Sequence, residues 1–158
     1  MVIAAPSGLA LGGGFEVLVQ SDYVVAHTNI VTGLVETIVG LIPAGGGTTN
    51  MLLRWMQAQE SKEDPDFAPQ KVFDIIGYGK TASSPIEAMP FKFLLEKDKI
   101  FMNRNKLLSA SQDLINEKKS GYKPPKKGIF KLSGNQVRDK MYQTLENLFK
   151  EKKILEHG

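Results

Sequence analysis

The chain of 158 residues has no cysteine, two histidines and one tryptophan. The lack of cysteine excludes disulfide bonds and thiolate catalysis, and it fits a reducing, cytoplasmic compartment. Two histidines far apart in the chain are a poor ligand set for zinc, so we predict no metal site. Met1–Leu11 contains no basic residue, and it therefore does not resemble a signal peptide.

Long apolar runs and basic residues are also scarce in the first part of the chain. The most apolar stretch, residues 24–42, is interrupted by His27, Asn29 and Glu36, so we expect no membrane span. Residues 1–60 contain a single basic residue, Arg54, whereas residues 61–158 contain nineteen basic and thirteen acidic residues. The basic stretch at 118–131 lacks the interleaved aromatic residues typical of nucleic-acid binding, so we predict no nucleic-acid partner.

Hydrophobic patterning predicts an α/β chain with a helix-rich second half. One side of a helix at 105–119 is expected to carry Leu107, Leu108 and Leu114, and the last helix has an apolar stripe that needs a partner surface. We divide the chain into a first unit (1–121), a Pro- and Gly-containing linker (122–134) and a C-terminal helix (135–158). Short strands are predicted at 2–5, 23–26, 30–32 and 99–102, helices at 14–21, 44–56, 71–76, 86–89, 105–119 and 135–153, and the stripe comprises Val137, Met141, Leu145, Leu148 and Phe149.

Two acidic residues, Glu16 and Glu36, lie in apolar segments without a lysine or arginine within ten positions. An ionised carboxylate is costly to bury, and burial raises the pKa of a carboxyl group toward the range in which it works as a general acid or base. Both residues are therefore candidate catalytic groups. The alternative is that both acids point to solvent from the edges of helices.

Glycines surround both acids and suggest a second element of a site. Gly12-Gly13-Gly14 precedes Glu16, and a glycine turn that begins a helix leaves backbone N–H groups without partners at its positive end. Such an amide can bind a carbonyl oxygen that gains negative charge, as in an oxyanion hole. Acids twenty positions apart cannot share one helix face, so only tertiary folding can bring the two together.

These residues carry a family resemblance. The segment "APSGLALGGGFEVLVQSDYVVAHTNIVTGLVETIVGLIPAGGGTTNMLLR" resembles the active-site half of the crotonase family, the enoyl-CoA hydratases and isomerases. The likeness covers residues 3–54 and extends more loosely to about Gly121. The tail that contains "YKPPKKGIFKLSG" is similar to bacterial multifunctional proteins in which a 3-hydroxyacyl-CoA dehydrogenase is fused to a crotonase domain. The resemblance implies the C-terminal portion of a crotonase-like (ClpP/crotonase) spiral.

The resemblance also implies roles for individual residues. The Gly13 N–H would be one of two donors to the thioester oxygen, and the Ala44 N–H would bind the catalytic water. Glu16 and Glu36 would activate that water and supply a proton as it adds to a trans-2-enoyl-CoA. The implied partners are an acyl-CoA substrate and either further copies of the chain or a fused dehydrogenase domain. No tightly bound cofactor is expected in this segment, and NAD is expected only with such a domain.

The expected function is therefore that of an enoyl-CoA hydratase, a lyase, within a multifunctional protein of fatty-acid β-oxidation. Double-bond isomerisation or another crotonase reaction is an alternative, and a non-catalytic assembly segment that docks through its helical tail is another. The residues that carry the first strands and the second oxyanion donor in the family resemble nothing in this chain. We therefore expect the segment to be weakly active or inactive alone.

Overall fold

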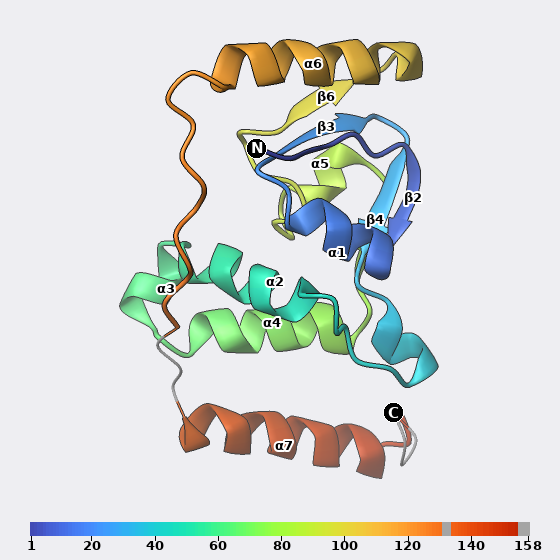
Figure 1. Cartoon of the computed structure of the whole chain (residues 1–158). Coiled ribbons are helices and arrows are strands. Elements are labelled where there is room, and N and C mark those ends of the chain that lie inside the picture. Colours follow the sequence, from blue (N-terminus) through green and yellow to red (C-terminus); the bar gives the residue numbers. More distant parts are fainter. Residues whose placement is uncertain (131–133, 155–158) are drawn as a thin grey trace.

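The computed structural model describes residues 1–130 and 134–154, to which every structural statement below refers. Short strands and helices alternate in the first part of the chain, and longer helices dominate the second part (Figure 1). The strands are β1 (Ile3–Ala4), β2 (Gly8–Leu11), β3 (Tyr23–His27), β4 (Ile30–Gly33), β5 (Thr81–Ala82) and β6 (Lys99–Phe101), and the helices are α1 (Gly13–Val19), α2 (Gly47–Met56), α3 (Glu60–Glu63), α4 (Phe67–Gly77), α5 (Pro85–Ala88), α6 (Leu107–Lys118) and α7 (Asn135–Lys150), with 3-10 helices η1 (Glu36–Val39) and η2 (Arg104–Lys106).

The strands form two small sheets. One has the order β1-β3-β6 and is parallel throughout, and the other has the order β2-β4-β5, with β2 parallel and β5 antiparallel to β4. The central strand β3 buries Val24, Val25 and Ala26 in succession. A strand that is covered on both faces needs such a continuous apolar run, and this is why the segment reads as uniformly hydrophobic.

Two hydrophobic clusters hold the fold together. The larger joins α1, α2, α4 and the two sheets. Its member Phe15 is fully buried, and the ring lies edge-on to Phe93 with 5.0 Å between the ring centres. In the smaller cluster Leu107 and Leu114 of α6 pack against Val25 of β3. The helix α6 therefore covers one face of the β1-β3-β6 sheet, while α1 and α5 lie on the other side (Figure 1).

Several element boundaries and side-chain directions differ from the sequence predictions. Helix α4 starts at Phe67, four residues before the predicted start, because Pro69 lies in its first turn, where the missing N–H is not needed. Leu108 is 81% exposed, so it does not share the buried side of α6 with Leu107 and Leu114. The sequence pattern missed this because positions 107 and 108 differ by about 100° around a helix.

The last helix ends earlier than predicted and buries only part of its stripe. Helix α7 stops at Lys150, because Lys152 takes a left-handed conformation and Lys153 N donates to Leu148 O at 2.9 Å, closing the helix end. Val137 is buried, whereas Phe149 is 53% exposed. Residues 155–158 of the predicted C-terminal helix lie outside the described residues, and the division into three units stays a prediction.

The segment 119–130 connects α6 to the region of α7 without regular secondary structure and runs past α2 (Figure 1). Gly128 lies so close to Leu53 of α2 that a Cβ atom on this glycine would overlap the leucine side chain. Helix α7 in turn packs on α4, where Lys140 forms an ion pair with Asp66 at 3.5 Å. Among the described residues, no helix combines the length and apolar character that crossing a bilayer requires.

Candidate active site

Glu16 lies in α1, is 8% exposed, and has a backbone partner. Its Oε1 accepts a hydrogen bond of 2.9 Å from the N–H of Gly47. Gly47 is the first residue of α2, and Gly46 before it is left-handed, with φ of 102°. The amide therefore belongs to the positive end of a ten-residue helix, which stabilises a negative charge on the carboxylate. The partner of the apparently isolated acid is a helix N-terminus.

The glycines at 45 and 47 are needed because side chains pass close to the backbone: the carboxylate of Glu16 at both positions, and Leu34 at position 47. A Cβ atom on Gly45 would overlap Glu16 Oε2, and a Cβ atom on Gly47 would lie 3.0 Å from Oε1. Any larger residue at position 45 would push the carboxylate away. Packing thus explains this glycine run, for which the sequence pattern predicts only the start of a helix.

Glu36 opens η1, and its carboxylate lies beside Gly12. A Cβ atom on Gly12 would be 3.3 Å from Glu36 Oε1. The other carboxylate oxygen, Oε2, is buried, and none of the described residues hydrogen-bonds to it. Thr37 fixes this short helix, because its hydroxyl donates to Ile76 O of α4 at 2.7 Å. The helix that carries Glu36 is therefore anchored to α4, while one carboxylate oxygen has no hydrogen-bond partner among the described residues.

The predicted backbone donors are the amides of Gly13 and Ala44. Gly13 is the first residue of α1 and is exposed, and its N–H has no acceptor among the described residues. Glu16 is the first residue of this helix whose N–H is hydrogen-bonded, and it donates to Gly12 O at 3.0 Å. Ala44 is exposed and immediately precedes Gly45, against which the Glu16 carboxylate packs. Gly13 and Glu16 thus belong to the first turn of α1, Glu36 lies beside Gly12, and Ala44 precedes the glycine that Glu16 contacts.

The alternative of two solvent-pointing acids is wrong for Glu16, which is buried. Glu36 is half-buried, with one shielded oxygen. Arg54 does not neutralise either acid: no ion pair among the described residues joins it to them. Its guanidinium instead donates to three backbone oxygens, at 2.7 Å, 2.8 Å and 3.4 Å, which belong to Lys92, Phe93 and Val19. Burial lowers the pKa of Arg54 to about 10, and the charge of Asp98 opposes this change.

Sequence reasoning missed two residues of this site. The Gly47 amide was not predicted as a partner of Glu16, although the triple glycine before a helix was a visible signal. Gln20 was also missed: its side-chain Nε2 donates to Glu16 O at 2.9 Å and to Gly45 O at 2.8 Å. No sequence signal distinguishes this glutamine, because its two acceptors are backbone atoms and one lies 25 residues away.

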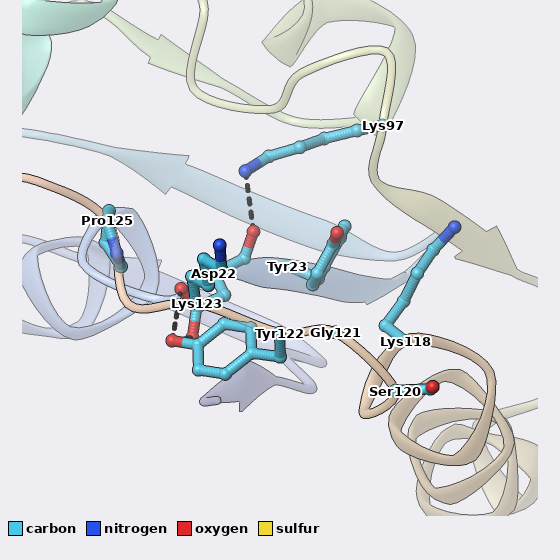
Figure 2. A pocket seen from close by; sticks show the side chains of 9 residues that line it. All are labelled: Asp22, Tyr23, Lys97, Lys118, Ser120, Gly121, Tyr122, Lys123 and Pro125. Carbon is cyan, nitrogen blue, oxygen red and sulfur yellow. Dashed lines mark hydrogen bonds between the residues drawn. The ribbon is translucent and has the colours of Figure 1, made fainter.

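A polar cavity of about 340 Å³ lies elsewhere, between the start of β3 and the segment 119–130 (Figure 2). Tyr122 donates to both carboxylate oxygens of Asp22, at 2.9 Å and 3.1 Å, and Lys97 donates to Asp22 O at 2.6 Å. Neither Glu16 nor Glu36 lines this cavity. Within the described ranges, no group of three or more His, Cys, Asp or Glu side chains is arranged to hold a metal ion.

The fold defines the class as a crotonase-like α/β protein. The solved enoyl-CoA hydratase EchA16_2 of Mycobacterium paratuberculosis superposes with a TM-score of 0.55 over 95% of this chain and 56% of that one. The two are 18% identical, so this likeness concerns the fold alone. It confirms the fold class predicted from the sequence.

Sequence comparison supports the family resemblance. Residues 1–63 match the model of the enoyl-CoA hydratase/isomerase family. A Bacillus subtilis relative named "Probable 3-hydroxyacyl-CoA dehydrogenase" is 36% identical over 134 residues, which are 84% of this chain and 17% of that protein. The "Peroxisomal bifunctional enzyme" of Danio rerio is 46% identical over 50 residues, 32% of this chain and 7% of the relative. The match of residues 1–63 confirms the resemblance to the crotonase family, and the chain spans less than a fifth of the length of these two relatives.

Proposed function

We propose that this chain supplies the two acid–base carboxylates and one oxyanion donor of an enoyl-CoA hydratase. The observation that carries the proposal is the convergence at the first turn of α1. The Glu16 carboxylate is held on the Gly47 amide, the Glu36 carboxylate lies beside Gly12, and the neighbouring Gly13 N–H is exposed without an acceptor among the described residues. Two carboxylates and an amide are the groups that water addition to an unsaturated thioester needs.

In the proposed reaction the oxygen of water bonds to C3 of a trans-2-enoyl-CoA as the C2–C3 double bond opens. One carboxylate accepts a proton from this water, and the other, as the carboxylic acid, delivers a proton to C2. The Gly13 N–H stabilises the negative charge that develops on the thioester oxygen. The product is a 3-hydroxyacyl-CoA, and transfer of one proton from the first acid to the second restores the starting state.

The test is hydration of crotonyl-CoA by the complete polypeptide encoded by the reading frame, with Glu16→Gln, Glu36→Gln and the control Glu96→Gln. Glu96 is exposed and outside the site. Loss of general acid–base catalysis should lower kcat by about 10²–10⁴-fold in either site variant, with the control unchanged. Loss in Glu36→Gln alone, together with conversion of a 3-enoyl-CoA, would instead indicate an isomerase. Full activity in both site variants would overturn the catalytic proposal.

We also propose that the hydratase segment works beside a 3-hydroxyacyl-CoA dehydrogenase in fatty-acid β-oxidation. The names of the Bacillus and Danio relatives support this. One is named a dehydrogenase and the other a bifunctional enzyme, and each aligns with this chain, whose residues 1–63 match the hydratase/isomerase family model. The product of hydration is the substrate of such a dehydrogenase. Crotonyl-CoA and NAD⁺ given to the complete polypeptide should yield NADH, and its absence with normal hydration would remove the dehydrogenase from the proposal.

A further inference from the structure

The loop before α2 contains three consecutive glycines, and its geometry depends on contacts with its neighbours. Glycine has the largest conformational freedom of all residues, so Gly45-Gly46-Gly47 has no intrinsic preference for the conformation that aims the Gly47 N–H at Glu16. Two side chains hold its carbonyl groups. Asn50 of α2 binds Gly46 O through Nδ2 at 2.8 Å, and Gln20 binds Gly45 O.

Gln20 connects this loop to the helix that carries Glu16. It is the residue directly after α1. Its side-chain Nε2 donates to Glu16 O of the helix at 2.9 Å and to Gly45 O of the loop at 2.8 Å. The backbone N–H of Gln20 bonds to Leu18 O, so the side chain takes the place of the helical bond to Glu16 O. One carboxamide thus joins the main chain of Glu16 to the loop that begins α2.

We propose that Gln20 is a positioning residue that keeps the Gly47 N–H on the carboxylate of Glu16. The bond to Gly45 O sets the orientation of the Gly45–Gly46 peptide, and Gly46 in its left-handed conformation then leads directly into the Gly47 amide. A Cβ atom on Gly46 would lie 3.4 Å from Gln20 Cδ, so the glutamine packs against this turn as well. The consequence for catalysis rests on the proposed hydratase function, whereas the consequence for the Gly47 amide does not.

The test uses the 158-residue chain and needs no substrate. In Gln20→Met the side chain keeps its approximate length but has no N–H donor, and we expect the Gly47 amide to exchange its hydrogen roughly 2- to 10-fold faster than in the unmodified chain. Its NMR resonance should shift as well. Gln59→Met is the matched control, because Gln59 is an exposed glutamine whose side chain bonds to Glu63 instead. This control should leave Gly47 unchanged.

A double-variant cycle separates positioning from a general loss of stability. In a Glu16→Gln background the strong carboxylate acceptor is already gone, so Gln20→Met should have little further effect on Gly47. Gln20→Lys, which restores donors, should recover part of the protection. Unchanged exchange and an unchanged Gly47 resonance in Gln20→Met would overturn the proposal, as would equal effects in both backgrounds.

The catalytic consequence is measured separately in the complete polypeptide. Gln20→Met should lower kcat for crotonyl-CoA while KM stays within about twofold, because the substituted side chain orients the acid and does not touch the thioester. If the polypeptide hydrates no enoyl-CoA while Gln20→Met still frees the Gly47 amide, the hydratase function fails and the positioning role stands. If hydration is normal and the Gly47 amide is unaffected in Gln20→Met, the positioning role fails and the hydratase function stands.

Discussion

The carboxylate of Glu16 accepts a 2.9 Å hydrogen bond from the N–H of Gly47, the first residue of helix α2. This contact joins two segments 31 residues apart and places a buried acid at the positive end of a helix. It explains how an acid without a basic neighbour in the sequence is accommodated in a charge-poor segment. It also makes the glycine loop before α2 a part of the candidate site.

Gly45→Ala should displace Glu16, because the added Cβ atom would overlap its Oε2. Overpacking of this kind costs about 1–3 kcal/mol of unfolding free energy, and the misplaced acid should lower hydration by the complete polypeptide by roughly 10²-fold. Urea unfolding and a crotonyl-CoA assay measure the two effects.

Gly14→Ala is the matched control for that substitution. Its added methyl group would meet nothing within 4 Å, and the position lies inside α1. Alanine is favoured over glycine in a helix by roughly 0.5–1 kcal/mol, so this variant should be slightly more stable and should keep its activity. A Gly45→Ala variant as stable and active as Gly14→Ala would show that the Glu16 carboxylate is not confined by the loop.

Thr37→Val should loosen the 3-10 helix that begins with Glu36. The lost hydrogen bond to Ile76 O contributes about 0.5–1.5 kcal/mol, while the carbonyl keeps its bond from the N–H of Gly79. We expect a lower urea midpoint and faster amide exchange across η1. Thr144→Val, which removes a hydroxyl bonded only within α7, serves as the control, and equal exchange in η1 for both variants would contradict the prediction.

Arg54→Lys should destabilise the fold, although the charge is kept. The guanidinium reaches backbone oxygens of three residues on two segments, and a lysine ammonium cannot reproduce this forked geometry. We expect a loss of about 1–3 kcal/mol in unfolding free energy, measured by urea denaturation. No change in the midpoint would mean that these hydrogen bonds do not contribute to stability.

The pKa of Arg54 gives this residue a predictable pH dependence. Burial lowers the pKa to about 10, below the ordinary value of the unfolded chain. The unfolded state therefore binds more protons at this site above about pH 10, and the contribution of Arg54 to stability rises with pH there. Compared with Arg54→Met, the unmodified chain should show a more positive slope of stability against pH in that range, and equal slopes would refute the shift.

Tyr122→Phe should release the segment 119–130 from Asp22. The phenol donates to both oxygens of this carboxylate. Desolvation and the Asp22 carboxylate raise the pKa of Tyr122 above its ordinary value. The hydrogen bond is therefore present at neutral pH and is lost as the pH rises above the usual range in which tyrosine ionises. Trypsin should cut after Lys126 and Lys127 faster in this variant. The exposed Tyr142, changed to Phe, should leave the cleavage rate as it is. Equal rates in both variants would show that the segment is held by other contacts.

Much of the site could be predicted because its elements are local. Gly12-Gly13-Gly14 before Glu16 predicted a helix with an open N-terminus, and α1 begins at Gly13 as this pattern indicates. The apolar run at 23–26 predicted the strand β3. In contrast, Leu108 is exposed and α7 ends at Lys150, because side-chain direction and helix termination depend on what packs against the element.

The amino-acid sequence by itself determined the family resemblance, the pattern of short strands and glycine turns, and the two acids that lie in apolar segments. Only the tertiary structure decided which groups those acids meet: Gly47 for Glu16, and Gly12 for Glu36. The reason is physical. Both contacts are made to the backbone of glycines, which carries no side-chain signature, and the position of a flexible glycine loop is set by partners such as Gln20 that are distant in the sequence.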